Sequence, residues 1–565
     1  MSKIKRLRAV LSGAVASALA VTMLPVLATT ATAATDPLGG QPGPVTLSPT
    51  MGQDGWQPNP PAGTTVDDFM RHPVLSWTAI SSLPVTQYRV QISPNANFTN
   101  NTVTLPNGGL TKSTQYDLPQ TLPHASYYWR VRGEDGAGHA TLWTGTQEGD
   151  YQSTWQFTKT WIDVPANPLP ATGSSSLRAF SWQPLPDASA YEFVISQDPG
   201  FPKSLSGIET YDCTTNHTAF SPSTDYPLKP SPATSAVEGG CDDFTTLMKD
   251  LQNGGTWYWH VRGIDGTSAA PTAAETAVTC YSDGADCGPW TATSTLSLPS
   301  MPGSGVALTP TNLSSGCSAV VPGGTVPLCY DTPTLTWNPV PNANSYLVET
   351  SADPLFTTDY HSSLTAFSAF TPRQSFHDNQ AGGSYYWRVR ACDTNFSGSG
   401  TFCTGASLQT PQFHKASLPL PLTPAGATST TGHNGLYVTT DNNQVPSSAV
   451  KQVRGAQMTF HWDDLLQYEQ QAGIAANQEA KEYRLQYSTS GNWLDDTATT
   501  TVVTDATHWT KQDGALADGG YYWRVAPVDG SGNLLAWSPT QTVVKGTVAP
   551  TVTIGETGLL APTSV

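Results

Sequence analysis

The stretch Tyr127-Tyr128-Trp129-Arg130-Val131-Arg132 decides the fold, because related stretches return at 257–262, 385–390 and 521–526. Aromatic and β-branched residues alternate with polar ones, which is the pattern of a β-strand with one buried face. Tyr127, Trp129 and Val131 are expected to point inward, since the other register would bury two arginines without partners. The corresponding tryptophans lie 130, 128 and 136 residues apart, so each copy is expected to form the centre of one repeat.

A second strand pattern precedes each of these stretches. It begins with a Tyr that is followed by a Ser five residues later and by an aromatic residue ten residues later. The constant spacing predicts that the Ser opens a turn and that the aromatic ring closes onto the core. The four sets are Tyr88, Ser93 and Phe98; Tyr191, Ser196 and Phe201; Tyr346, Ser351 and Phe356; and Tyr483, Ser488 and Trp493.

The order of elements predicts an all-β fold. Short strands separated by turns and long loops, with no helices alternating between them, favour antiparallel β-sandwiches over βαβ units. Pro-rich joints at 164–170, 298–302 and 418–424 favour an extended, semi-rigid string. The expected divisions are a signal peptide at 1–33, repeats at 36–160, 164–298, 303–416 and 419–546, and a tail or the start of a further strand at 547–565. Repeat 4 also carries an extra segment, 465–480, expected to form a short helix interrupted near Gly473.

These residues resemble the fibronectin type III domain, an immunoglobulin-like sandwich with a late strand of the form Tyr-x-apolar-x-Val-x-Ala. Tyr127, Trp129 and Val131 match it, and so do the equivalent residues of repeats 3 and 4, whereas repeat 2 has Trp257 in place of the Tyr. The chain is similar to secreted, bacterial-type proteins built from tandem fibronectin type III domains. The resemblance implies four such sandwiches in a string, with loops enlarged beyond the roughly 100 residues of an immunoglobulin-like domain. For function it implies a spacer or a binding module.

Composition and the first residues indicate the compartment. Charged residues make up only 12% of the chain, and the net charge is −17, which becomes −21 once the basic leader is removed. So acidic a chain, with no basic run beyond its first ten residues, is a poor candidate for nucleic acid or an anionic membrane. Basic residues, an apolar run from Ala9 to Leu27 and the small residues at 31–33 predict a signal peptide, with an uncleaved membrane anchor as the alternative. No second apolar stretch is long enough to span a bilayer. We therefore expect a secreted, extracellular protein, free or associated with the cell surface.

Eight cysteines in an exported chain predict disulfide bonds. None lies in a Cys-x-x-Cys motif, which argues against zinc or redox use. Eight thiols allow 105 pairings, but their positions favour four sequential bridges within repeats. These are Cys213–Cys241, Cys280–Cys287, Cys317–Cys329 and Cys392–Cys403.

The motifs of known catalytic and metal sites are missing from the sequence. It has no H-E-x-x-H, no G-x-S-x-G, no P-loop and no G-x-G-x-x-G. Acidic neighbours at 67–68, 242–243, 463–464 and 495–496 are interpreted as solvated loop carboxylates, with a glycosidase pair or a calcium site as the alternative. We expect no catalytic residues, no metal and no cofactor.

One possible contact surface remains on the outward side of the repeated strands. Tyr and Arg are frequent in binding hot spots, and aromatic faces stack on sugars. The preferred interpretation is structural, with each Arg lying over a Tyr ring and pairing across strands. This contact stripe comprises Tyr128, Arg130, Arg132, Tyr258, Arg262, Tyr386, Arg388, Arg390, Tyr522 and Arg524.

The sequence therefore favours a secreted, non-enzymatic spacer, scaffold or adhesion protein. Its partner would be an extracellular protein or a polysaccharide, with no nucleic acid. The first alternative is a polysaccharide-binding accessory protein. The second is an extracellular hydrolase with its site in the enlarged loops of repeat 2 or repeat 4.

Overall fold

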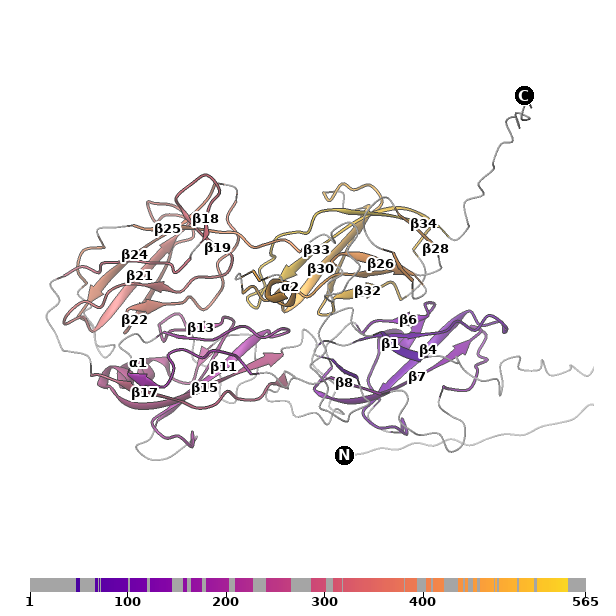
Figure 1. Ribbon diagram of the computed structural model, residues 1–565, viewed down its shortest axis with the longest axis horizontal. Helices are drawn as coiled ribbons and strands as arrows, with labels where there is room; N and C mark the ends of the chain where they lie inside the picture. The colour runs from indigo at the N-terminus through magenta and orange to yellow at the C-terminus, as the bar shows by residue number, and fades with distance from the viewer. Residues whose placement is uncertain are drawn as a thin grey trace, which may run out of the picture. The chain divides into compact units, whose positions relative to one another are not determined.

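The structure is a computed structural model of the whole chain (Figure 1). It describes residues 47–50, 67–69, 71, 73–99, 102–118, 122–144, 156–159, 164–174, 179–202, 209–226, 240–265, 286–300, 308–317, 319–380, 382–393, 403–407, 410–420, 435–440, 443–445, 451–454, 458–471, 473–474, 477–494, 497–512 and 516–546. The predicted signal peptide, 1–33, and the tail, 547–565, lie outside these residues.

Repeats 1 and 2 each contain two sheets (Figure 1). In repeat 1 the sheet orders are β1-β3-β6 and β2-β8-β7-β4-β5, and in repeat 2 they are β10-β13 and β14-β12-β11-β15-β17-β9, with β16 beside β15. The elements of repeat 1 are β1 (Leu47–Thr50), β2 (Asp67–Phe69), β3 (Val74–Trp77), β4 (Gln87–Ser93), the 3-10 helix η1 (Pro106–Gly109), β5 (Leu110–Thr111), β6 (Gln115–Tyr116), β7 (Ala125–Glu134) and β8 (Gln156–Lys159). Those of repeat 2 are β9 (Gly173–Ser174), β10 (Phe180–Ser181), β11 (Ala190–Ser196), β12 (Thr210–Thr215), β13 (Ala219–Phe220), β14 (Gly240–Cys241), α1 (Phe244–Asn253), β15 (Gly255–Asp265), β16 (Asp286–Cys287) and β17 (Ser294–Leu298).

Repeats 3 and 4 follow the same scheme. Their sheet orders are β20-β23 with β18-β19-β25-β24-β21-β22, and β27-β26-β29-β32 with β28-β34-β33-β30-β31. The elements of repeat 3 are β18 (Ala319–Val320), β19 (Pro327–Cys329), β20 (Leu335–Thr336), β21 (Ser345–Ser351), β22 (His361–Thr365), β23 (Ala369–Phe370), β24 (Tyr385–Cys392) and β25 (Gln412–Lys415). Those of repeat 4 are β26 (Tyr437–Thr440), β27 (Asn443–Val445), β28 (Lys451–Arg454), β29 (Thr459–His461), α2 (Leu465–Gln471), β30 (Glu482–Ser488), β31 (Thr499–Thr504), β32 (His508–Thr510), β33 (Gly519–Val528) and β34 (Gln541–Gly546).

The register of the repeated strand agrees with the sequence pattern. Tyr127, Trp129 and Val131 on β7 are at most 1% exposed. The phenol of Tyr127 donates to the carbonyl of Pro123 at 2.8 Å, and Tyr385 and Tyr521 make the same kind of bond in repeats 3 and 4. In repeat 2 the indole N–H of Trp257 donates to the carbonyl of Gly254 at 3.2 Å. An indole therefore replaces the tyrosine without leaving the carbonyl unpaired.

The Tyr–Ser spacing also has a common cause in all four repeats. Each Tyr hydroxyl accepts a main-chain N–H from the residue three positions after the Trp that precedes it in the chain, as between Ile80 and Tyr88 at 2.9 Å. These tryptophans are Trp77, Trp182, Trp337 and Trp462. Each Ser accepts the N–H two residues later, as between Asn95 and Ser93 at 3.0 Å. The expectation that the Ser opens a turn is therefore correct.

The prediction of four fibronectin type III-like sandwiches in a string is wrong. Residues 38–565 form one compact unit, in which small, mainly antiparallel sheets are arranged like the blades of a four-bladed β-propeller. The physical reason lies in contacts between repeats, such as the ion pair of Arg71 with Asp187, and in the anchoring of a Pro-rich joint. Leu420, in the joint 418–424, is fully buried in the core of repeat 4, and the N–H of Leu418 donates to Gln478 Oε1 at 2.9 Å. A joint anchored in this way does not act as a spacer.

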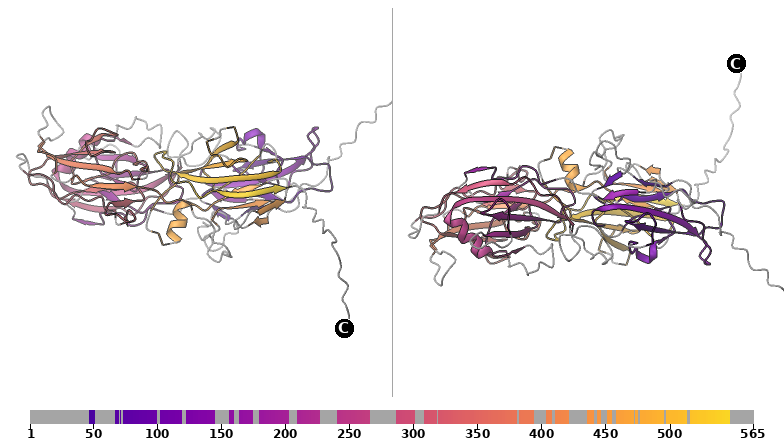
Figure 2. Two further views of the ribbon diagram at one scale, coloured as in Figure 1. Left: turned by 90° about the horizontal axis from the view of Figure 1, so that it is seen from above. Right: turned by 90° about the horizontal axis from the view of Figure 1, so that it is seen from below.

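Two α-helices interrupt the β-structure of the described residues. α2 covers the first half of the expected segment in repeat 4, and Gly473 after it has a left-handed φ of 67°, as the break near that residue requires. Figure 2 shows α2, in orange, beside the strands of repeat 4. Helix α1 was missed by the sequence analysis, although Asp243 caps it by accepting the N–H of Thr246 at 2.9 Å. In the part of the chain that the structure describes, no helix is long and apolar enough to cross a membrane.

Candidate functional site

The contact stripe lies on one face of β7, β15, β24 and β33, as the alternation predicts. Most of its arginines pair with the neighbouring strand, whereas Arg132 pairs within its own strand β7. Arg262 contacts Glu192 at 2.6 Å, and Arg388 and Arg390 contact Glu349 at 2.8 and 2.9 Å. Arg132 contacts Glu134 at 2.8 Å, while Arg130 and Arg524 donate to Gln91 and Gln486. Burial alone would raise the pKa of Glu349, but the hydrogen bonds from its two arginines outweigh burial and lower that pKa to about 2.

The aromatic residue of the Tyr–Ser spacing covers the stripe, so the expectation that it closes onto the core is wrong. The guanidinium carbon of Arg130 lies 4.1 Å from the ring centre of Phe98, and that of Arg388 lies 4.0 Å from Phe356. Phe98, Phe201 and Phe356 all have a left-handed φ, between 47° and 59°. This backbone is uncommon for a phenylalanine, so the cation–π contact accompanies a local strain.

A second set of rings, which the sequence analysis did not identify, closes the stripe from the other side. Trp143 lies 4.5 Å from Arg130, Trp537 lies 4.1 Å from Arg524, and in repeat 2 His260 is stacked between Phe201 and Trp290 at 3.9 Å from each. Repeat 3 has Ala406 at the corresponding place. A signal was present, because each Trp precedes a hydroxyl residue that accepts an N–H from the repeated strand, as Thr144 does from Val131. The stripe arginines thus lie against aromatic rings and against the side-chain oxygens of Glu or Gln residues.

A second polar assembly joins the repeats to one another. We call it the inter-repeat cluster. It comprises Arg71 and Lys159 of repeat 1, Asp187, Tyr191, His217 and Asp265 of repeat 2, Asp331, Ser375, Asp378 and Lys415 of repeat 3, Ser417 directly after repeat 3, and Asp464, Glu469, Glu479, Asp529 and Asn533 of repeat 4.

Arg71 is a residue of the cluster with partners in two other repeats. Its guanidinium lies 2.7 Å from Asp187 of repeat 2 and 3.0 Å from Asp464 of repeat 4, and it donates to the carbonyls of Ala480, at 2.8 Å, and Asp505. The side chain is only 4% exposed. Burial alone would lower the pKa of Arg71, but the two carboxylates outweigh burial and raise it. Arg71 is therefore a buried, charged link between repeats 1, 2 and 4.

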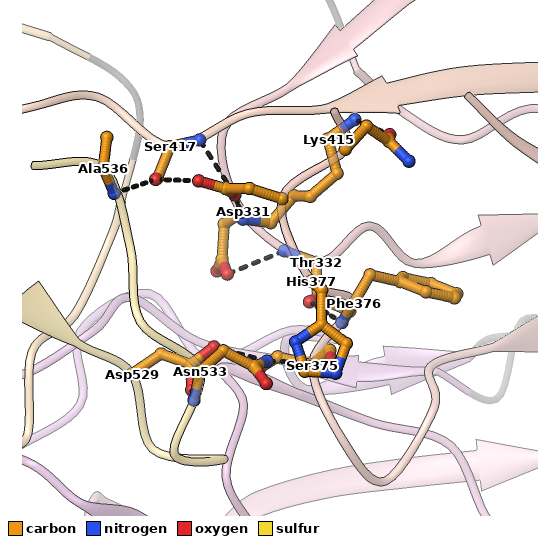
Figure 3. Close-up of polar contacts among 12 residues, drawn as sticks. Asp331, Thr332, Ser375, Phe376, His377, Lys415, Ser417, Asp529, Asn533 and Ala536 are labelled. Atoms are coloured by element: carbon orange, nitrogen blue, oxygen red, sulfur yellow. Dashed lines mark hydrogen bonds and ion pairs between the residues drawn. The ribbon is translucent and has the colours of Figure 1, made fainter. Parts of the chain in front are cut away.

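Further links connect the repeats to one another. Lys159 forms a fully buried ion pair with Asp265, and the phenol of Tyr191 donates to Glu479 at 2.8 Å. Repeats 3 and 4 meet where Asn533 donates to the carbonyl of Ser375 at 3.0 Å and the N–H of Ala536 donates to Ser417 Oγ at 2.7 Å (Figure 3). Ser375 Oγ also lies 3.3 Å from His217 Nδ1, which brings repeat 2 to the same place.

Burial raises the pKa values of several acids of the cluster, among them Asp331, Glu469 and Glu479. Burial raises the pKa of Asp331 to about 6, although Lys415 and the N–H of Thr332, at 2.7 Å, act in the opposite direction (Figure 3). Burial also raises the pKa of Glu469 to about 8. Glu469 is 0% exposed; Oε2 accepts the N–H of Gln478 at 2.8 Å, and Oε1 has no hydrogen-bond partner among the described residues. A carboxyl in this position holds its proton near neutral pH and is closed to substrate.

The acidic neighbours are therefore not solvated as a group. Asp464 is buried against Arg71, Asp463 accepts the N–H of Gly435 at 2.8 Å, and Asp243 caps α1. The pair at 67–68 lies on β2, and the pair at 495–496 lies outside the described residues. Sequence could not distinguish these cases, because the partner of Asp464 lies 393 positions away. Within the described ranges, no group of three or more His, Cys, Asp or Glu side chains is arranged to hold a metal ion.

The disulfide bonds agree with three of the four predicted pairings. Cys213–Cys241, Cys317–Cys329 and Cys392–Cys403 are formed, and each lies within one repeat. Cys280 lies outside the described residues, and Cys287 is itself disulfide-bonded.

Comparisons with known proteins add little to this picture. No protein-family model matches the chain, and no curated protein matches it. Among solved structures, the chain is similar to the FN1–FN3 domains of chicken CNTN1, with 11% identity over 67% of this chain and 100% of that one. The TM-score is 0.17, so fibronectin-type domains are a distant structural neighbour of this fold and no more.

Proposed function

We propose that this protein is a secreted, non-enzymatic scaffold or adhesion protein whose four repeats act as one rigid body. The observation that carries the proposal is Arg71, a buried cation whose carboxylate partners come from two other repeats. A rigid body holds its surface loops at fixed distances, which suits a protein that presents several contacts to an extracellular partner. The disulfide bonds support an extracellular location.

The chemistry of the polar groups also supports a non-enzymatic role. The stripe arginines are paired with carboxylates or amides and stacked on rings, so they offer no free row of cations. Glu469, whose pKa burial raises to about 8, is fully buried. General acid catalysis needs a group within hydrogen-bond reach of the substrate, and Glu469 lacks that access.

Two measurements test the proposal. Calorimetry of the mature protein is expected to give a single cooperative transition, whereas four separate transitions would contradict a rigid body. Prolonged incubation with polysaccharide, ester and peptide substrates is expected to release no product. Hydrolysis that disappears in Glu469→Gln or Asp331→Asn would show instead that the protein is an enzyme.

A further inference from the structure

A pocket with a volume of about 290 Å³ lies between repeats 1 and 4. It is bordered by β5 and β6 from repeat 1 and by β31 and β32 from repeat 4. Each of these strands is the last in its sheet among the described residues, so the pocket lies where four sheet edges meet. Its lining comprises Pro106, Asn107, Leu110, Tyr116, Asp117, Leu118, Val502, Val503, Thr504, Trp509, Thr510 and Gln512.

The corresponding boundary between repeats 2 and 3 is closed by the chain itself. There Ser223, shortly after β13, forms an antiparallel bridge with Thr365 of the edge strand β22. The N–H of Thr224 also donates to the carbonyl of Leu364 at 2.8 Å. Two repeats of this kind can therefore meet edge to edge by main-chain contact. The pocket is a feature of the boundary between repeats 1 and 4 and is not imposed by the repeat.

The strongest sign of a ligand is the side-chain amide of Gln512. Both of its polar atoms are buried, and neither has a hydrogen-bond partner among the described residues. A buried amide left unpaired destabilises a protein by about 1–3 kcal/mol per group, so a natural pocket seldom keeps one without use. The amide supplies one acceptor and two donors to an incoming molecule.

Two further polar groups complement this amide. Asp117 is buried at the pocket, with His508 Nε2 at 3.2 Å from its Oδ1. Thr504 Oγ accepts the N–H of Ala506 at 3.1 Å, a bond that leaves the hydroxyl proton available to donate. A matching ligand must therefore carry groups that both donate and accept hydrogen bonds.

The remaining wall is apolar and aromatic. Leu110, Leu118 and Val502 line it together with the rings of Tyr116 and Trp509. Trp509 is half-buried and is held in place by Phe460 and Tyr487, at ring distances of 6.2 and 5.5 Å. Amphipathic aromatic rings of this kind are well suited to a ligand that has one apolar face and polar groups at its rim.

We propose that this pocket binds a neutral sugar unit of a polysaccharide or glycan. Asp117 disfavours phosphate, sulfate and carboxylate ligands, and its ion-pair distance to His508 leaves it poorly placed to hold an organic cation. A sugar ring packs its C–H face on the apolar wall and exchanges hydrogen bonds with Gln512 and Thr504. The volume is at the lower end of the roughly 300–1,000 Å³ of small-molecule sites, which suits one or two rings. The inference names a ligand class and does not depend on the scaffold role.

The test uses the full mature protein and soluble trisaccharides of glucose, mannose, xylose and N-acetylglucosamine. Binding is followed by Trp fluorescence and by saturation-transfer NMR at millimolar sugar. At least one of these sugars is expected to bind, while glucuronic acid and trimethyl-lysine, the anionic and cationic probes, are not. Absence of binding by all four sugars, or preferential binding of trimethyl-lysine or of an extended peptide, would overturn the proposal.

Two variants place the binding in the pocket. Gln512→Leu removes an amide that has no protein partner, so it is expected to fold normally and to bind about tenfold more weakly through the loss of one or two hydrogen bonds. Val503→Trp fills the pocket from a half-exposed position without removing any polar group, and is expected to abolish binding. The matched control is Gln183→Leu, at an exposed glutamine of repeat 2. Sugar binding that survives both pocket variants would show that the site lies elsewhere, whatever the outcome for the scaffold role.

Discussion

Replacing Arg71 by Met should loosen repeat 1 from repeats 2 and 4. The change removes ion pairs at 2.7 Å to Asp187 and at 3.0 Å to Asp464, together with bonds to two main-chain carbonyls. Breaking a buried ion pair by removing one partner costs about 3–5 kcal/mol, because the remaining charge stays buried. We expect a loss of this size in the free energy of unfolding, which is a large part of the 5–15 kcal/mol of a typical domain.

Chemical denaturation and calorimetry measure this effect, with Arg132→Met as the matched control. Arg132 also forms an ion pair, at 2.8 Å to Glu134, but its side chain is 30% exposed and the pair is screened by solvent. The control should therefore lose at most about 1 kcal/mol. Arg71→Met should also split the single transition, with repeat 1 melting earlier.

A second variant separates the charge effect from the loss of packing. Combining Arg71→Met with Asp187→Asn and Asp464→Asn removes the uncompensated charges, so much of the lost stability should return. If Arg71→Met behaves like Arg132→Met, with one unchanged transition, the reasoning that places a buried link at Arg71 is refuted.

Three other changes test the cores, the buried acids and the disulfide bonds. Trp387→Ala should destabilise the protein by about 3–5 kcal/mol, because the indole is 0% exposed in the core of repeat 3. An unchanged melting temperature would contradict the inward register of β24. Glu469 has a folded-state pKa of about 8, above its ordinary value. Its contribution to the stability of the folded protein is therefore fully present at low pH and is lost as the pH rises from about 4.5 through 8. Glu469→Gln should therefore be more stable than the wild type at pH 8 by about 1–4 kcal/mol and differ little near pH 4, and a difference that does not depend on pH would refute this assignment. Replacing Cys213 and Cys241 by Ser should lower the free energy of unfolding by about 3 kcal/mol. The same change at Cys392 and Cys403 should lower it less, because the first bridge closes a separation of 28 residues and the second a separation of 11. The reverse order in denaturant titrations would contradict a loop-entropy origin.

Local features of the repeats could be predicted from the sequence, because their causes lie within a few residues or one strand pair. Alternation placed Trp129 inward, and the constant Tyr–Ser spacing located a turn that a hydroxyl stabilises in every repeat. Three of the disulfide bonds join cysteines of one repeat that are 11 to 28 residues apart, so positions along the chain were sufficient to pair them.

The assembly of the repeats could not be predicted in the same way. Arg71 resembles any loop arginine in the sequence, and its partners lie 116 and 393 positions away. Pro-rich joints support either a spacer or an anchored connection, and the burial of Leu420 decides between them only once the fold is known. A pattern that describes each repeat therefore carries no information about how the repeats meet.

The aromatic residue ten positions after each Tyr shows why regular spacing can support the wrong function for a residue. The spacing is constant because the ring must reach one fixed place, but that place is the cation on the outer face and not the core. In repeat 2 the cation is replaced by His260, whose pKa burial lowers to about 4, so a neutral ring is stacked between Phe201 and Trp290. Because the stack persists when the central group is neutral, ring packing contributes to it beyond the cation–π attraction. The stripe is therefore conserved among the four repeats as a packed layer over the sheet, which leaves the boundary pocket with its unpaired Gln512 as the better place to look for a ligand.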